Sequence, residues 1–103
     1  MDILFHSHHA TISPGLRQRT ERGLRKLERR FGRPIGATVR FEEDGPTRRV
    51  EIVLTVPKSR RFVAAADGRF FGPAVSAALS RLAAQLDHLK RSKKTEARKP
   101  VRA

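Results

Sequence analysis

The order in which the spacing of hydrophobic residues changes along the chain restricts its fold more than any other feature. Hydrophobic residues alternate with polar ones over about residues 2–8, and they recur at three- and four-residue steps over about 14–31. Three further alternating segments follow, and helical spacing returns over about 70–91. Alternation indicates a strand with one buried face, whereas steps of three and four indicate a helix with one buried stripe. The sequence therefore predicts the order strand, helix, three strands, helix.

Residues that start and stop regular structure support these boundaries. Ser13 is suited to cap the first helix and Pro14 to occupy its first position, while Gly32 and Pro34 are typical of its end. The later strands are predicted over about 35–42, 49–56 and 62–66.

The segment EEDGPT, residues 42–47, predicts the hairpin turn between the second and third strands, at a length greater than the two-residue ideal. The small residues Ala64 and Ala66 predict that another element packs closely on the fourth strand.

These elements predict an α+β fold, a single βαβββα domain over residues 1–91. A right-handed crossover through the first helix makes the first two strands parallel, and short turns make the last three an antiparallel meander. The result is a four-stranded mixed sheet with two parallel helices on one face. Residues 92–103 lack hydrophobic periodicity and are predicted to form a basic, disordered tail. We expect a monomer.

The charge balance points to a polyanionic partner. Lys and Arg number 23 against 10 Asp and Glu, so the net charge is +13 and the isoelectric point is near 11.7. The excess lies mostly in residues 14–33 and 88–103. Such concentration favours binding to nucleic acid over a merely solvated surface. The chain lacks cysteine and has no apolar run long enough to span a membrane, so we expect a cytoplasmic protein without disulfides or thiolate chemistry.

The first helix is predicted to present its cations away from the core. Placed on a helix, Arg22, Arg25, Lys26 and Arg29 point outward, with Arg19 and Arg30 on one flank and Glu21 and Glu28 on the other. On the second helix the outward positions are Arg81, Ala84, His88 and Arg91. Guanidinium groups suit phosphates. With no Trp or Tyr, and with six Phe mostly at core positions, the sequence predicts recognition of the RNA backbone without aromatic stacking.

The sequence resembles the N-terminal half of bacterial hibernation-promoting factors and the related ribosome-associated inhibitor, a family also described as sigma-54 modulation proteins. The matching positions in the first third are Ile3, Phe5, His9, Ile12, Leu16, Arg17, Glu21, Leu24, Lys26, Leu27, Glu28, Arg29 and Phe31. The strand EIVLTVP, the turn AAADG, and the spacing of Val75, Leu79, Leu82, Gln85 and Leu86 continue the match to about residue 90.

The resemblance implies binding to the decoding region of the small ribosomal subunit, within the 30S subunit or the 70S ribosome, where basic helices lie along 16S ribosomal RNA and exclude mRNA and tRNA under stress. The candidate RNA-binding residues are Arg22, Arg25, Lys26, Arg29, Arg30, Arg81, His88, Lys90 and Arg91. Relatives usually carry an aromatic residue at the position of Gly72 and further cations near Ala84 and Asp87. Long relatives add a dimerisation domain, so this chain is similar to a short form.

Three alternative functions fit the sequence less well. A double-stranded-RNA-binding domain also packs two helices on a sheet, but it begins with a helix. A protein that modulates a sigma factor would not need so basic a surface. An enzyme or zinc site would rest on His6, His8 and His9, without Cys or a clear carboxylate partner. We therefore expect no catalytic residues, metal, cofactor or small-molecule substrate.

Overall fold

The computed structural model describes residues 1–32, 35–58 and 61–98, with side chains up to residue 89. It contains six elements in the predicted order. They are β1 (Ile3–His8), α1 (Pro14–Phe31), β2 (Gly36–Asp44), β3 (Thr47–Thr55), β4 (Arg61–Gly68) and α2 (Phe71–Arg98). The predicted βαβββα order is confirmed. No described helix combines the length and the apolar character needed to cross a membrane.

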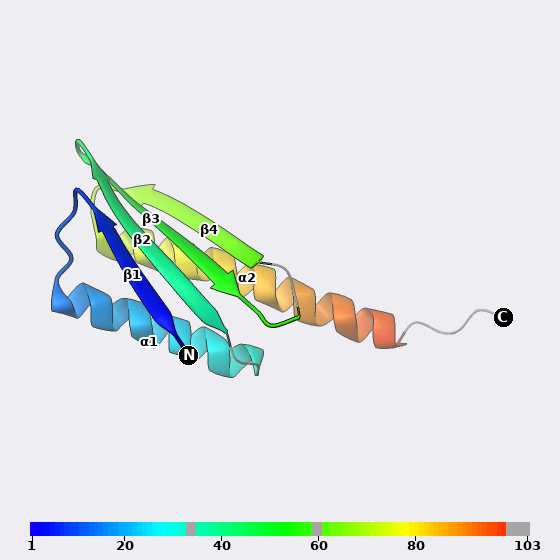
Figure 1. Cartoon of the computed structure of the whole chain (residues 1–103). Helices are drawn as coiled ribbons and strands as arrows, with labels where there is room; N and C mark the ends of the chain where they lie inside the picture. Colours follow the sequence, from blue (N-terminus) through cyan, green and yellow to red (C-terminus); the bar gives the residue numbers. More distant parts are fainter. Residues whose placement is uncertain (33–34, 59–60, 99–103) are drawn as a thin grey trace.

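The sheet has the strand order β1-β2-β3-β4. β1 pairs with β2 in parallel, while β2, β3 and β4 form an antiparallel meander. Both helices lie on one face of the sheet and begin at the same end of the molecule, so they run parallel (Figure 1). The predicted α+β architecture, with a mixed sheet and two parallel helices, is confirmed.

Both ends of α1 follow from the local sequence. The Ser13 side chain accepts a hydrogen bond of 3.1 Å from the backbone N–H of Leu16, and Pro14 is the first helical residue. At the other end Gly32 has a φ of 77°, and its N–H donates a 2.9 Å bond to the carbonyl of Glu28. Glycine adopts this left-handed conformation without steric cost, so the helix stops there.

The turn between β2 and β3 is tighter than predicted. The ladder continues to the pair Asp44 and Thr47, which leaves only Gly45 and Pro46 in the loop. Gly45 has a φ of 57°, and a glycine with positive φ at the first of two central positions fits a type II′ turn. The predicted longer turn is therefore wrong, because Asp44 extends the ladder despite its low strand propensity and pairs with Thr47, a β-branched residue that favours strands.

The end of α2 was also predicted too early. The helix runs to Arg98, beyond the predicted end near residue 91, and extends past the end of α1 (Figure 1). The added segment has no hydrophobic stripe, but Lys, Glu, Ala and Arg are good helix formers and it contains neither Gly nor Pro. Residues 99–103 lie outside the described residues, and the division of the chain into a domain over residues 1–91 and a tail stays a prediction.

The core lies between the helix layer and the sheet. Its fully buried members come from α1, the three later strands and α2, with Ala64 and Ala66 of β4 buried where α2 packs closely. This confirms the expected role of the small residues. The core residues are Leu24, Leu27, Phe31, Ile35, Ala37, Val39, Phe41, Val50, Ile52, Leu54, Val56, Phe62, Ala64, Ala66, Ala74, Val75, Ala78, Leu82 and Leu86.

Both apolar and polar contacts join the helices. A Cβ atom added to Gly23 would lie 2.4 Å from Cδ1 of Leu79, so the absence of a side chain on α1 makes room for that leucine. Arg19 donates a 2.8 Å hydrogen bond to the Ser76 hydroxyl. Further along, Arg30 and Asp87 form an ion pair of 2.5 Å. The two polar contacts therefore lie on either side of the close approach of Gly23 to Leu79.

The burial pattern predicts that substitutions on the two faces of the sheet differ greatly in their effect on the free energy of unfolding. Ile52→Ala should lower the free energy of unfolding by about 2–5 kcal/mol, because it leaves a cavity in the core. Leu4→Ala, on the opposite face and 61% exposed, should change it by less than about 0.5 kcal/mol. Urea denaturation measures both. Equal effects of the two substitutions would contradict the assignment of the buried face.

The Gly23 contact predicts coupling between the helices. In a Leu79→Ala background, Gly23→Ala should stabilise the protein by about 0.5–1 kcal/mol, because alanine is the better helix former. In the wild-type background the added methyl group must displace Leu79, so that gain should be lost. Thermal unfolding of the four proteins in this double-mutant cycle measures the coupling. The same effect of Gly23→Ala in both backgrounds would show that the helices do not meet here.

Candidate nucleic-acid interface

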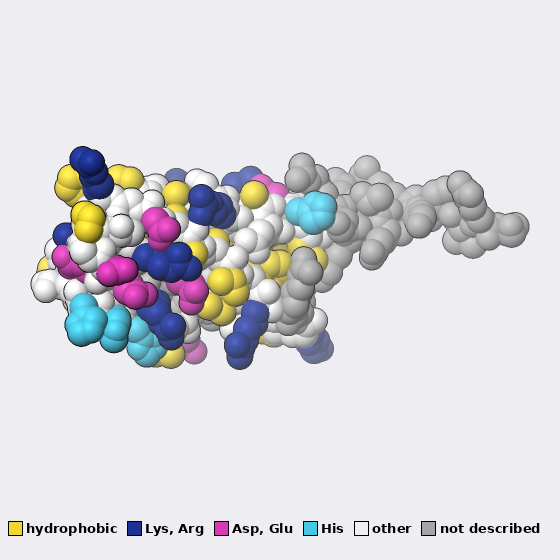
Figure 2. Space-filling view, turned by 90° about the horizontal axis from the view of Figure 1, so that it is seen from above, with side chains coloured by type: hydrophobic (Ala, Val, Ile, Leu, Met, Phe, Trp, Pro, Cys, Tyr) yellow, Lys and Arg dark blue, Asp and Glu magenta, His cyan; other side chains and the backbone are white. Residues whose placement is uncertain are grey.

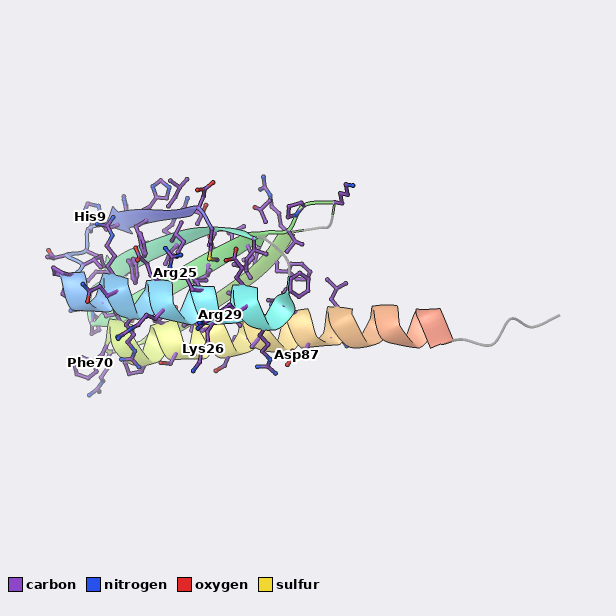
Figure 3. All side chains as sticks on the ribbon, turned by 90° about the horizontal axis from the view of Figure 1, so that it is seen from below. His9, Arg25, Lys26, Arg29, Phe70 and Asp87 are labelled. Atoms are coloured by element: carbon purple, nitrogen blue, oxygen red, sulfur yellow. The ribbon has the colours of Figure 1, made fainter. Side chains whose placement is uncertain are left out.

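One face of α1 carries a continuous group of exposed cations. We call Arg19, Arg22, Arg25, Lys26 and Arg29 the α1 basic surface. All five are exposed, and together with Gly23 and Glu28 they line a hollow on the outside of the helix. Figure 3 shows Arg25, Lys26 and Arg29 along this side. Spacings of three and four residues along the helix bring these side chains to one face.

The α1 basic surface keeps its positive charge in the part of the chain that the structure describes. Within the described part of the chain, none of its five residues takes part in an ion pair. The nearby acidic residue Glu28 is only half-exposed, and its carboxylate accepts a 3.1 Å hydrogen bond from the backbone N–H of Ile35. That carboxylate therefore serves the connection from α1 to β2. Several uncompensated cations on a rigid helix form a surface suited to a polyanion.

Arg30, predicted as an RNA contact, lies at the junction of the two helices. Its guanidinium pairs with the Asp87 carboxylate of α2, with side chains 62% and 34% exposed. A pair this exposed contributes only about 0–1 kcal/mol to stability. It nevertheless gives Asp87 a structural partner, at a position where relatives were expected to carry cations. Helix periodicity alone did not predict this ion pair of Arg30.

Arg81 lies on the other flank of α2, away from the α1 basic surface. Its guanidinium donates a hydrogen bond to the carbonyl of Ala65, and Gln85 donates one of 2.9 Å to the carbonyl of Val63. Both acceptors belong to β4, which is an edge strand of the sheet. The two side chains therefore cover polar backbone groups that an edge strand leaves unpaired. The structure does not bring Arg81 together with the cations of α1.

The remaining predicted contacts lie farther along α2. His88 is exposed, and Lys90 and Arg91 belong to the helix but their side chains lie outside those described. Of the nine predicted residues, the structure gathers Arg22, Arg25, Lys26 and Arg29 into one surface. Arg19, predicted on a flank of the helix, lies at the edge of this surface next to α2, where it donates its hydrogen bond to Ser76.

The open face of the sheet carries charges of both signs. Figure 2 looks onto this face and shows basic, acidic and histidine side chains interspersed with hydrophobic ones. Along one row across the strands, Glu42 lies opposite Arg49, and Arg49 forms a 3.3 Å ion pair with Asp67. Acidic residues thus lie among the cations of this face, whereas the α1 basic surface has no ion pair among the described residues. Cross-strand pairs of opposite charge favour the sheet locally.

The histidines of β1 also lie on the open face. His6 is opposite Arg40, His8 is opposite Glu42, and the rings of His8 and His9 meet edge to face at 4.2 Å between centroids. Among residues that the structure describes, no three His, Cys, Asp or Glu side chains are grouped to hold a metal ion. His6 and His8 therefore lie on the same face of β1.

One aromatic residue departs from the expectation that phenylalanines belong to the core. Phe70 precedes α2 and is 70% exposed, whereas its neighbour Phe71 packs edge to face on Phe41 at 5.4 Å between centroids. The signal in the sequence was the helical stripe, which includes Phe71 and leaves Phe70 outside it. The prediction that the surface lacks a stacking platform overlooked this residue.

Comparison with known proteins places this architecture in a family. The family model described as sigma 54 modulation protein / S30EA ribosomal protein matches residues 3–94. Among curated protein sequences, none is significantly similar to this chain.

Solved structures share the fold at low sequence identity. The N-terminal domain of Thermus thermophilus Protein Y superposes with a TM-score of 0.78 at 22% identity, over 86% of this chain and 99% of that one. A ribosomal subunit interface protein from Coxiella burnetii gives a TM-score of 0.77 at 24% identity, over 88% and 99%. The family match spans nearly the whole described chain and agrees with the resemblance to hibernation-promoting factors. The chain belongs to the sigma-54 modulation protein / S30EA ribosomal protein family.

Proposed function

We propose that this chain is a ribosome hibernation factor that binds the small subunit at the decoding region and keeps mRNA and tRNA out under stress. The observation that carries the proposal is the α1 basic surface, whose cations form no ion pair among the described residues. Family membership supports a ribosomal target. The partner is the 30S subunit, free or within the 70S ribosome. The protein would act in the cytoplasm as a monomer, and it would bind without a cofactor or a small-molecule substrate.

Contact with the phosphate backbone of 16S ribosomal RNA accounts for the residue types. Each guanidinium can donate two hydrogen bonds to one phosphate, and each neutralised phosphate releases condensed counterions. Arg22, Arg25, Lys26 and Arg29 are fixed on a helix, so they can match the spacing of phosphates in a folded RNA. Such contacts position the protein by RNA shape, without reading base sequence.

The other predicted residues would contribute unequally. Arg30 and Arg81 would have to release intramolecular acceptors, so we expect them to add less than the α1 basic surface. His88, Lys90 and Arg91 lie on the part of α2 that continues toward and past the end of α1, so they would extend the contact along the RNA.

A second candidate function is the modulation of a sigma factor, which the family description also names. The mixed charges of the open sheet face, with Leu4 and Val63 exposed beside them, would suit a protein partner. Pulldown with and without nuclease separates the two functions. A ribosomal partner is lost when RNA is digested, whereas a sigma factor stays bound. A double-stranded-RNA-binding domain does not fit, because this fold begins with β1.

Charge reversal on α1 tests the proposed interface. Arg22, Arg25 and Arg29 changed together to Glu should abolish binding to the small subunit and inhibition of translation, while the melting temperature changes little because all three are exposed. The control changes Arg40, Lys58 and Arg61 to Glu, three exposed cations outside α1 that form no ion pair among the described residues, with the same change in net charge. Sedimentation with purified subunits measures binding. Equal loss in both variants would mean that only overall charge matters.

The salt dependence of binding tests phosphate neutralisation. With about six phosphate contacts, affinity for the small subunit should fall roughly a thousandfold between about 50 and 200 mM salt. Lys26→Gln should weaken binding at every salt concentration and lower the slope of log affinity against log salt by about one. Titration at several salt concentrations gives the slope. An unchanged slope in this variant would remove Lys26 from the phosphate contacts.

A further inference from the structure

Phe70 contributes little to the fold at its position. Its side chain is 70% exposed, the largest exposed fraction among the large hydrophobic residues described. It also stands where a capping residue would belong, because α2 begins at Phe71 and the Phe70 carbonyl accepts a bond from the N–H of Ala74. That position favours Ser, Thr, Asp or Asn, as at Ser13 in α1, and a phenylalanine ring cannot cap. Neither burial in the core nor capping of α2 explains why a phenylalanine occupies this position.

Two arginines lie at the start of α2, where Phe70 is located. Arg69 precedes Phe70 and is exposed. Arg19 reaches across from α1 to the first turns of α2, where it is held by its hydrogen bond to Ser76. Its Nη1 atom lies 3.0 Å from the position that a Cβ of Gly72 would occupy, so the missing side chain makes room for the guanidinium. Arg19, a cation of the α1 basic surface, therefore lies beside Gly72, two residues after Phe70 in the chain.

The location of Phe70 also suits a contact with RNA bound to the α1 basic surface. Figure 3 shows Phe70 projecting from the end of the helix layer at which both helices begin, on the view that also displays Arg25, Lys26 and Arg29. An RNA strand that follows the α1 basic surface toward Arg19 would reach this end. Proteins that bind single-stranded RNA combine cations for the backbone with exposed aromatic rings on which unpaired bases stack.

We propose that Phe70 stacks against an unpaired RNA base while Arg19 and Arg69 bind the adjoining phosphates. This inference rests on the proposed RNA-binding function and adds a base contact to it. Every base has an aromatic face, so the contact would anchor the protein without selecting a sequence. It would require a nucleotide that is not already stacked within a helix, which limits binding to loops, bulges or ends of the RNA.

Substitution separates stacking from a merely apolar contact. Phe70→Ala should weaken binding to purified small subunits about fivefold to 150-fold, which corresponds to the loss of one base–aromatic stack. Phe70→Leu should weaken it similarly because leucine has no aromatic face, whereas Phe70→Trp should retain affinity. Exposure of the side chain means that the melting temperatures should stay close to that of the wild type. Full affinity with leucine would overturn the inference in favour of an apolar contact.

Fluorescence gives a direct readout, because the chain contains no Trp or Tyr. Phe70→Trp creates a single fluorophore, and its emission should be quenched saturably by a short unstructured oligoribonucleotide and by small subunits. Leu4→Trp, on the open sheet face, is the matched control and should not be quenched.

The outcomes distinguish this inference from the proposed function. If the wild type binds subunits while Phe70→Ala binds equally well, only the stacking contact is wrong. If the wild type does not bind subunits, the proposed function fails, and the oligoribonucleotide titration still decides the stacking contact. Absence of quenching in that titration would overturn the stacking contact. A blue shift without quenching on subunits would instead indicate burial against protein, which also contradicts it.

Discussion

Gly23 of α1 lies against Leu79 of α2, and this close approach lets two helices share one face of a four-stranded sheet. The hydrogen bond from Arg19 to Ser76 and the ion pair between Arg30 and Asp87 flank it. Because both helices cover the same face, their outer surfaces form one continuous layer and the other face of the sheet stays open. The cations of α1 are thus carried by a packed helix and not by a loop, which fixes their spacing more firmly.

The charges are sorted between the two sides of this arrangement. On the open sheet face, Arg49 lies between Glu42 and Asp67 and is paired, whereas the α1 basic surface has no ion pair in the described residues. A polyanion would therefore orient the protein with its helix layer inward. The proposed phosphate contacts and the proposed stacking of Phe70 lie on this same layer. Both would be lost if the partner bound the sheet instead.

The sequence predicted the fold well because its signals are local. Ser13, Gly32 and the alternation in β3 define elements whose order leaves few topologies once the crossover is right-handed. Contacts between distant segments were not predictable in this way. Helix periodicity places Arg30 and Arg81 on the outside, but it cannot reveal Asp87 or the Ala65 carbonyl as their partners. The length of α2 was missed because its last turns depend on helix propensity without a hydrophobic stripe, and Phe70 because it lies one residue outside that stripe.

Competition on the small subunit tests the central claim most directly. The labelled protein is bound to purified small subunits, and saturating mRNA and tRNA are then added while its occupancy is followed by sedimentation. A protein that occupies the decoding region must be displaced, and in the reverse experiment it must prevent mRNA and tRNA from binding. We expect mutual exclusion. Unchanged occupancy of the protein in the presence of bound mRNA and tRNA would contradict the account.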